Sequence, residues 1–242
     1  MASNQRTLYD SNFAVAFLWP FKVAIGLTVT YVMLGAGAIA IALLFAKYQW
    51  WEDPIQASDT LFYQESSRVK TLSESTGSQA RLALVANASM QSAYWLFFKA
   101  PTLHEATQAH FAGARVNKVD KMYFEQFVAR NAREIYISMN VIQVYGIKMG
   151  FLISAAPLFF LLYLVAGIDG FTERYIRRAC AGRESSDMNK LGKLSKLMLL
   201  ASLSMIYLCM PVSLDPIWII VPLAVVFAVG TRIQWKFYKK YL

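Results

Sequence analysis

The sequence is poor in charge, in cysteine and in histidine, and each shortage excludes a class of protein. Charged residues make up 16% of the 242 positions and hydrophobic residues 57%, whereas typical globular domains have about 25% and roughly 45–50%. Two cysteines, Cys180 and Cys209, exclude a disulfide framework, and His104 and His110 are not spaced to share one helix face as metal ligands. We therefore expect a membrane protein without a metal or another cofactor.

The sequence also lacks the motifs of common catalytic sites. It has no P-loop, no glycine-rich dinucleotide turn, no nucleophile elbow and no HExxH pair. Its long apolar segments contain no acid, base or histidine, apart from Asp215 at a turn and Lys148 near a boundary. Because transporters and proton-driven machines place ionisable groups deep in the membrane, we predict a protein that is neither an enzyme nor an active transporter.

Long uncharged segments predict an all-α, polytopic membrane protein with four transmembrane helices and a helical periplasmic cap between the first and the second. A helix needs about 20 apolar residues to cross the hydrocarbon core. The predicted segments are a cytoplasmic N-terminus (1–22), a first span (23–46), a periplasmic helical region (47–134), a second span with a periplasmic extension (135–168), a basic cytoplasmic loop (169–196), a third span (197–214), a fourth span (217–231) and a basic cytoplasmic tail (232–242).

Local signals refine these spans. Pro157 lies inside the second span, where the missing backbone donor predicts a kink. Asp215 and Pro216 separate the last two spans and predict a tight hairpin, in which Asp215 caps the final helix. The uncharged segment Leu82–Phe98 competes as a fifth span, but polar side chains near its middle favour an amphipathic helix in the cap.

The positive charge is gathered in three short segments, 1–22, 169–196 and 232–242, which account for almost all of the net charge of +9. Short loops rich in lysine and arginine stay in the cytoplasm. This predicts that both termini and the 169–196 loop are cytoplasmic and that the long segment between the first two spans is outside. Topology and contact with the lipid bilayer explain the basicity, so direct nucleic-acid binding is not expected.

Two further clusters are candidate interaction sites. The most apolar patch outside the spans contains Tyr94, Trp95, Phe97 and Phe98, and it either packs within the cap or at the membrane interface, or docks another membrane protein. The first span carries small residues that allow close helix packing, against another span of the chain or against a second subunit of a homo-oligomer. These small residues are Gly35, Ala36, Ala38, Ala40 and Ala42.

One region carries a family resemblance. Residues 167–178 read Gly-Ile-Asp-Gly-Phe-Thr-Glu-Arg-Tyr-Ile-Arg-Arg, and residues 182–186 read Gly-Arg-Glu-Ser-Ser. With the run Pro-Leu-Ala-Val-Val-Phe-Ala over 222–228 and the Lys-Lys-Tyr-Leu ending, this region resembles the inner-membrane protein family of integrating conjugative elements and related plasmids, a domain of unknown function. That family continues with aromatic residues and a Tyr-His pair, where this chain has Asp-Met-Asn over 187–189, so no role is carried over to those positions.

The resemblance implies a non-enzymatic inner-membrane component or accessory of a conjugative, type IV secretion-like DNA transfer apparatus. It would act in assembly or scaffolding through its basic loop and its cap, with other inner-membrane conjugation proteins, such as the coupling ATPase, as partners. Arginine offers two parallel donors to carboxylate or phosphate, so the basic loop is a candidate docking site for a partner or for lipid headgroups. The candidate residues are Arg174, Arg177, Arg178, Arg183 and Glu184.

Two other functions stay open at this point. A protein of exclusion or partner recognition would use its periplasmic cap to bind the machine of another cell. A small oligomeric channel or transporter would assemble its subunits around a pore, although the apolar spans of the single chain argue against this.

Overall fold

The computed structural model describes residues 3–100, 103–105, 107, 126–180 and 186–238. It confirms the all-α class, because the described residues form helices and no strand. The helices are α1 (Ser3–Lys47), α2 (Pro54–Glu74), α3 (Ser78–Tyr94), the π-helix η1 (Trp95–Lys99), α6 (Ala132–Ser154), α7 (Ala156–Ala179), α8 (Ser186–Cys209) and α9 (Pro216–Lys236).

Four helical segments in the described part of the chain are long and apolar enough to cross a membrane, in agreement with the predicted number of spans. They are Lys22–Lys47, Ala132–Ala179, Met188–Cys209 and Pro216–Lys236. Large apolar side chains on their outer faces are exposed, among them Leu27, Phe160, Leu197 and Val225. A lipid environment explains this exposure, because lipid tails are as apolar as these side chains. The segment 82–98 lies in α3 and η1 and is not one of the four.

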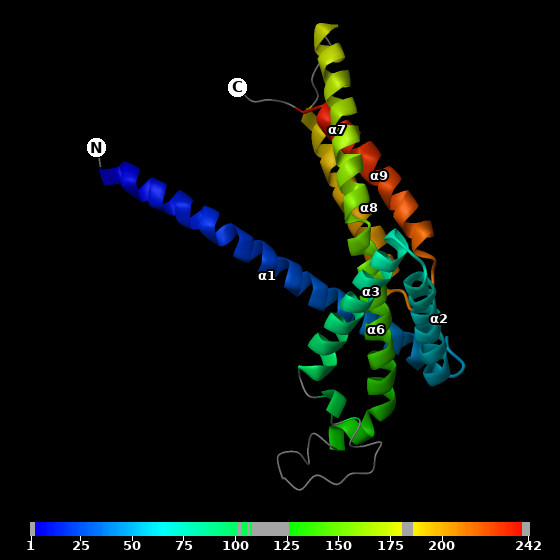
Figure 1. Cartoon of the computed structure of the whole chain (residues 1–242). Coiled ribbons are helices and arrows are strands. Elements are labelled where there is room, and N and C mark those ends of the chain that lie inside the picture. Colours follow the sequence, from blue (N-terminus) through cyan, green and yellow to red (C-terminus); the bar gives the residue numbers. More distant parts are fainter. Residues whose placement is uncertain (1–2, 101–102, 106, 108–125, 181–185, 239–242) are drawn as a thin grey trace.

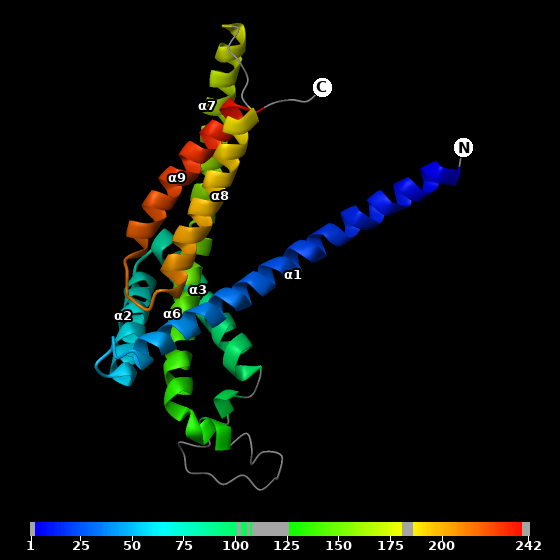
Figure 2. The same cartoon turned by 180° about the vertical axis from the view of Figure 1, so that it is seen from behind.

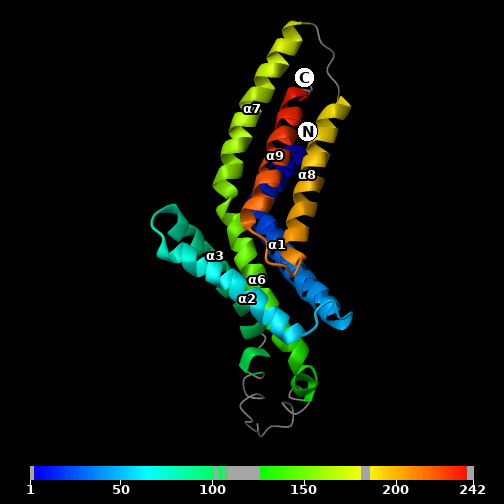
Figure 3. The ribbon, with the colours of Figure 1, turned by 90° about the vertical axis from the view of Figure 1, so that its right-hand side faces the viewer.

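The helices form two regions joined by one long rod, which consists of α6 and α7 (Figure 1). In the first region α9 lies between α7 and α8, and the three run side by side (Figure 3). In the second region α2 and α3 pack on α6, which adjoins α7 and leads away from the bundle after a change of direction (Figure 3). Helix α1 contacts α6 and α8 with its C-terminal half and diverges from the bundle toward its N-terminus (Figure 2).

The rod is interrupted once within its described length, at Ala155, two residues before Pro157 in the first turn of α7. Proline fits the first turn of a helix but cannot donate a backbone hydrogen bond to the turn before it. This interruption is therefore the kink that Pro157 predicts. Asp215 likewise caps α9 as predicted, since its Oδ1 accepts a hydrogen bond of 3.1 Å from the backbone N–H of Ile217.

The predicted 169–196 loop requires correction. Helix α7 continues to Ala179 and α8 begins at Ser186, so most of that segment is helical. Ion pairs between α7 and α9 explain the longer helix, because Arg232 Nε lies 2.7 Å from Asp169 Oδ2 and holds the polar end of α7 against its neighbour. The third span also ends earlier than predicted, at Cys209, and residues 210–215 form the turn of the hairpin.

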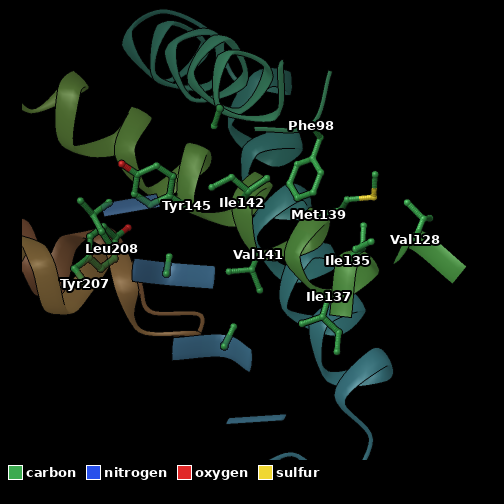
Figure 4. Packing of buried hydrophobic residues seen from close by; sticks show 13 residues of the cluster. Phe98, Val128, Ile135, Ile137, Met139, Val141, Ile142, Tyr145, Tyr207 and Leu208 are labelled. Carbon is green, nitrogen blue, oxygen red and sulfur yellow. The ribbon is translucent and has the colours of Figure 1, made fainter. Parts of the chain in front are cut away.

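The largest apolar core lies where α1, α6, α8 and η1 meet (Figure 4). Its fully buried aromatic side chains are Tyr145 and Tyr207. The hydroxyl of Tyr145 donates a hydrogen bond of 2.9 Å to the carbonyl of Tyr31, which ties α6 to α1. Ile142 and Phe98 pack in the same cluster, so the π-helix of the cap belongs to the core that also holds the first span.

Helix α3 approaches α6 through two glycines one turn apart. A Cβ built on Gly146 would lie 2.6 Å from the Cα of Met90, and one on Gly150 would lie 2.5 Å from the Cα of Ala86. Real Cβ atoms do not come this close to backbone, so only glycine lets the two helices meet here. This is the small-xxx-small packing known from membrane helices.

This contact predicts the effect of one added methyl group. Gly150→Ala forces α3 away from α6, and we expect the free energy of unfolding to fall by about 1–3 kcal/mol, the usual cost of overpacking. The measurement is unfolding of the purified chain in mixed detergent micelles.

Gly26→Ala is the matched control, because nothing lies within 4 Å of a Cβ at this helical glycine. It should leave stability unchanged or raise it by up to about 1 kcal/mol through better helix propensity. Equal effects of the two substitutions would contradict the close α3–α6 contact.

Candidate functional site

A lysine inside the molecule holds the turn between α8 and α9. Lys148 on α6 is fully buried, and its Nζ donates hydrogen bonds of 2.7 Å to the carbonyl of Met210 and 2.9 Å to that of Val212. The same ammonium lies 5.4 Å from the ring centroid of Tyr207. Met210 and Val212 follow Cys209, the last residue of α8, so the ammonium binds carbonyls of the turn itself.

The sequence around Lys148 explains its direction. Gly146 and Gly150 lie two residues before and after it, and two residues correspond to about 200° of helix rotation. The glycine face of α6 packs on α3, so the opposite face, which carries Lys148, points to the hairpin turn. One helix thus presents a close-packing surface and a buried charge to two different neighbours.

Helix α2 supplies the opposite charge. Glu65 is fully buried, and its Oε2 accepts a bond of 2.8 Å from Arg68, one turn further along α2. Its Oε1 accepts a bond of 2.9 Å from the hydroxyl of Ser213 in the hairpin turn. Arg68 also donates to the carbonyl of Leu214 at 3.2 Å. Both carboxylate oxygens of Glu65 therefore have partners, as a buried charge requires.

We name this set of side chains the hairpin clamp: Lys148, Glu65, Arg68 and Ser213, with the turn carbonyls that they bind. Lys148 and Arg68 donate to carbonyls of the turn, and Ser213 in the turn donates to the buried carboxylate of Glu65. Replacing a whole buried ionic group by apolar residues can be neutral, whereas removing one member leaves the others unpaired and costs about 3–5 kcal/mol. The clamp therefore makes the positions of α2, α6 and the hairpin depend on one another.

A second polar contact joins α2 to α6 nearer the start of both helices. Asp59 Oδ1 accepts bonds from the Asn140 side chain at 2.6 Å and from the Tyr136 hydroxyl at 3.0 Å. Ser58, which is fully buried, accepts from the same Asn140 amide at 3.3 Å. Leu61, also buried, follows one turn later on the same face of α2. Helix α2 is thus fixed to α6 at two levels.

The hairpin clamp connects α2, α6 and the α8–α9 turn through charge and hydrogen bonds. Its carboxylate is saturated by donors, and Lys148 is enclosed by the turn and the Tyr207 ring. Among the described residues no group of three or more His, Cys, Asp or Glu side chains is placed to hold a metal ion. What this arrangement can do chemically is fix helices by charge and hydrogen bonds.

The predicted arginine site lies at the other end of the rod, on the last turns of α7. The Arg177 guanidinium lies 4.3 Å from the ring centroid of Phe237, and that of Arg174 lies 5.4 Å from the ring of Tyr238. Arg178 is on the same turns of α7, whereas Arg183 and Glu184 lie outside the described residues. The structure thus brings these arginines onto the residues that follow α9, and docking of a partner there stays a prediction.

The acidic side chains of α7 at this end are engaged by α9. Glu173 forms ion pairs with Arg232 and Lys236, and Arg232 also pairs with Asp169. This pairing fixes α9 to α7 and leaves the basic surface without those two acids as counter-charges. The basic end is therefore built from two helices and not from a single loop.

The predicted aromatic patch is divided by the structure. Phe98 is buried in the core, and Tyr94 stacks on it with ring centroids 5.7 Å apart. Phe97 packs against Gly35 of α1. Trp95 is 58% exposed and faces away from this packing. A docking role for the patch stays a prediction, and it rests on Trp95 because the other three side chains serve the interior.

Tyr94 has a second partner in His104. Its hydroxyl lies 2.6 Å from His104 Nδ1, and the two rings meet edge to face. Burial raises the pKa of Tyr94 above its ordinary value, so the phenol is protonated at neutral pH and can donate to the imidazole. The pair fastens the segment after η1 to the cap.

The small residues of the first span fall on two faces of α1. Gly35, Ala38 and Ala42 are buried, in contact with the cap and with α6 and α8. Ala36 and Ala40 are exposed. The Ala38/Ala42 pair therefore packs within the chain, and Ala36/Ala40 is the pair that faces outward.

Sequence reasoning missed the hairpin clamp. Its members are far apart in the chain, so no local spacing brings Glu65 or Ser213 to Lys148. Two signals were present. Lys148 is the single charged residue in the predicted second span, 135–168, and Gly146 and Gly150 flank it in a glycine-xxx-glycine pattern. An intramembrane charge is a functional candidate by default, and these signals mark α6 as a packing centre.

Comparison with protein-family models places most of the chain in one family. Residues 49–239 match the model described as IncC plasmid conjugative DNA transfer protein DtrJ-like. The matched range begins after α1 and includes every residue of the hairpin clamp and the described arginines of α7. It confirms the relation to conjugative transfer that the sequence resemblance implied. Searches of curated proteins and of solved structures gave no match.

The hairpin clamp predicts a large effect of removing its lysine charge. Lys148→Met keeps most of the volume but leaves the carbonyls of Met210 and Val212 without the ammonium that donates to them. We expect the free energy of unfolding to fall by about 3–5 kcal/mol, measured on the purified chain in mixed micelles.

Lys70→Met makes the same chemical change at an exposed position of α2 and should shift stability by no more than about 0.5 kcal/mol. If Lys148→Met were as mild as this control, the buried ammonium would not hold the hairpin.

Proposed function

This chain belongs to the DtrJ-like family of conjugative DNA transfer proteins, and from that we propose that it is a non-enzymatic, multi-pass protein of the bacterial inner membrane that scaffolds the transfer apparatus. Membership in this family indicates the process in which the chain takes part, which is conjugative DNA transfer. The scaffolding role is inferred from how the helices are held together.

The observation that supports scaffolding is the hairpin clamp. It ties α2 of the cap, the α6–α7 rod and the α8–α9 hairpin through a buried lysine and a buried glutamate. A scaffold must keep its two ends at a fixed distance and orientation. Buried ionic contacts fix the helices to one another, because loss of any one partner lowers the free energy of unfolding strongly. The proposed role follows from this rigidity.

The rod gives the scaffold its two ends. Helices α6 and α7 form a segment of 48 residues from Ala132 to Ala179. The cap packs on α6 (Figure 3), and the arginines lie on the last turns of α7 at the other end. We place the arginine end in the cytoplasm, because basic segments stay inside, and the cap in the periplasm. The amino-terminal end of α1 points toward the same end of the molecule as the arginines, which supports cytoplasmic termini (Figures 1 and 3).

In this proposal the basic end of α7 and α9 docks another inner-membrane conjugation protein, and the coupling ATPase of the apparatus is the partner we favour. Arg177 and Arg174 stand beside aromatic rings, and such rings keep a guanidinium plane fixed for two parallel bonds to a carboxylate. The lipid bilayer covers the exposed apolar faces of the four long helices.

The arginine end predicts a transfer phenotype. Arg177→Ala combined with Arg178→Ala should lower transfer frequency at least about tenfold at normal protein levels, the effect of losing about 1.4 kcal/mol of docking free energy. The measurement is complementation of a deletion of the gene, with protein level checked in the membrane fraction.

Lys70→Ala with Arg81→Ala removes the same charge from exposed positions of the cap and should leave transfer unchanged. Normal transfer by the double-arginine variant would leave these arginines a topological role alone and would refute docking at this end.

A further inference from the structure

The outward face of α8 carries a shallow groove that none of the roles above uses. Its volume is about 520 Å³. The lining residues are Lys190, Leu191, Lys193, Leu194 and Leu197. The three leucines are 54–65% exposed. The groove therefore combines two amino groups with an uncovered apolar surface on a single helix.

The direction of this face is fixed by the contact between α8 and α9. A Cβ built on Gly192 would lie 2.8 Å from Ile233 Cγ2, and Lys196 Nζ donates a bond of 2.8 Å to Gln234 Oε1. These two positions point to α9. At 3.6 residues per turn, positions 190, 194 and 197 lie on the opposite side, and position 193 lies on the flank between the two faces. The groove residues consequently face away from the bundle.

The two lysines of the groove have no ion-pair partner within the described part of the chain. Asp169 and Glu173, acids at this end of the rod, are engaged by Arg232 and Lys236 from α9. Two positive charges three residues apart, neither of them in an ion pair with a described side chain, favour an anionic ligand.

The order of residues along the helix selects the kind of anion. Lys190 and Lys193 lie in the first turn with Leu191, and Leu194 and Leu197 extend over the next turn, about 10 Å in all at 1.5 Å per residue. Seen from the cytoplasmic end of α8, charge lies at the level of lipid headgroups and the apolar surface lies at the level of acyl chains. A free phosphate ion would contact the lysines and leave the apolar surface of the leucines without a ligand.

We propose that this groove binds one anionic phospholipid, with its phosphate between the amino groups of Lys190 and Lys193 and an acyl chain along Leu194 and Leu197. Basic pockets at the cytoplasmic ends of membrane helices bind such headgroups. The site rests on the proposed membrane embedding, with this end of α8 at the cytoplasmic surface, and it adds a ligand that the scaffolding role does not require.

The test is lipid binding by the full-length chain, purified in neutral detergent and titrated with cardiolipin under native mass spectrometry. Lys190→Gln with Lys193→Gln should weaken cardiolipin binding about thirtyfold, since each interfacial lysine contributes roughly fivefold. Lys190→Arg with Lys193→Arg should retain it. Leu197→Asn, which changes no charge, should also weaken it. Size exclusion and circular dichroism check that each variant is folded.

Lys70→Gln with Arg81→Gln is the matched control, because it removes the same charge from exposed positions of the cap. It should bind cardiolipin as the parent does, and an equal loss would show diffuse attraction and overturn the site. Displacement of cardiolipin by millimolar inorganic phosphate, or unchanged binding by Leu197→Asn, would overturn the acyl groove.

A further outcome would also overturn the lipid assignment. If Lys190→Gln with Lys193→Gln binds cardiolipin normally but no longer captures an acidic transfer protein, the face is a protein docking site. The binding assay on purified protein is independent of transfer, so failure of the lipid site and failure of the scaffolding role are distinguished.

Discussion

The arrangement of the other helices depends on one contact, between the buried ammonium of Lys148 and the carbonyls of the hairpin turn. Removing a cation from water costs several kcal/mol, which only good geometry and further hydrogen bonds recover. Here the ammonium finds two carbonyls of the hairpin turn, and a buried carboxylate on α2 lies in the same cluster. The lysine cannot stay buried unless the hairpin and the cap are both in place, so the interior charge requires the complete fold.

Helix α6 is the element that makes these requirements compatible. Its glycine face admits α3, its lysine face holds the hairpin, and Asn140 and Tyr145 bind α2 and α1. The same helix continues into α7, which ends at the arginines. A conjugative DNA transfer protein built in this way can hold a cap and a basic end at a fixed separation, which is the property that a scaffold contributes to a larger assembly.

Much of the fold followed from local patterns, whereas the hairpin clamp did not. Uncharged runs indicated four spans, Pro157 the kink, and Asp215 the cap of α9, because each depends on a few neighbouring residues. The helical boundaries at Ala179 and Cys209 were missed, since ion pairs from α9 extend α7 and the clamp ends α8 early. The hairpin clamp joins residues more than 60 positions apart, and no spacing in a single sequence reports such contacts.

The most direct test of a shared buried network is a double-mutant cycle on the free energy of unfolding, with Lys148→Met, Glu65→Gln and both together in mixed micelles. Groups of one network show interaction energies of about 0.5–3 kcal/mol, whereas independent sites add within about 0.5 kcal/mol. The double variant should lose clearly less stability than the two single losses combined. Strict additivity would show that the lysine and the glutamate act separately, and would contradict the clamp as a single unit.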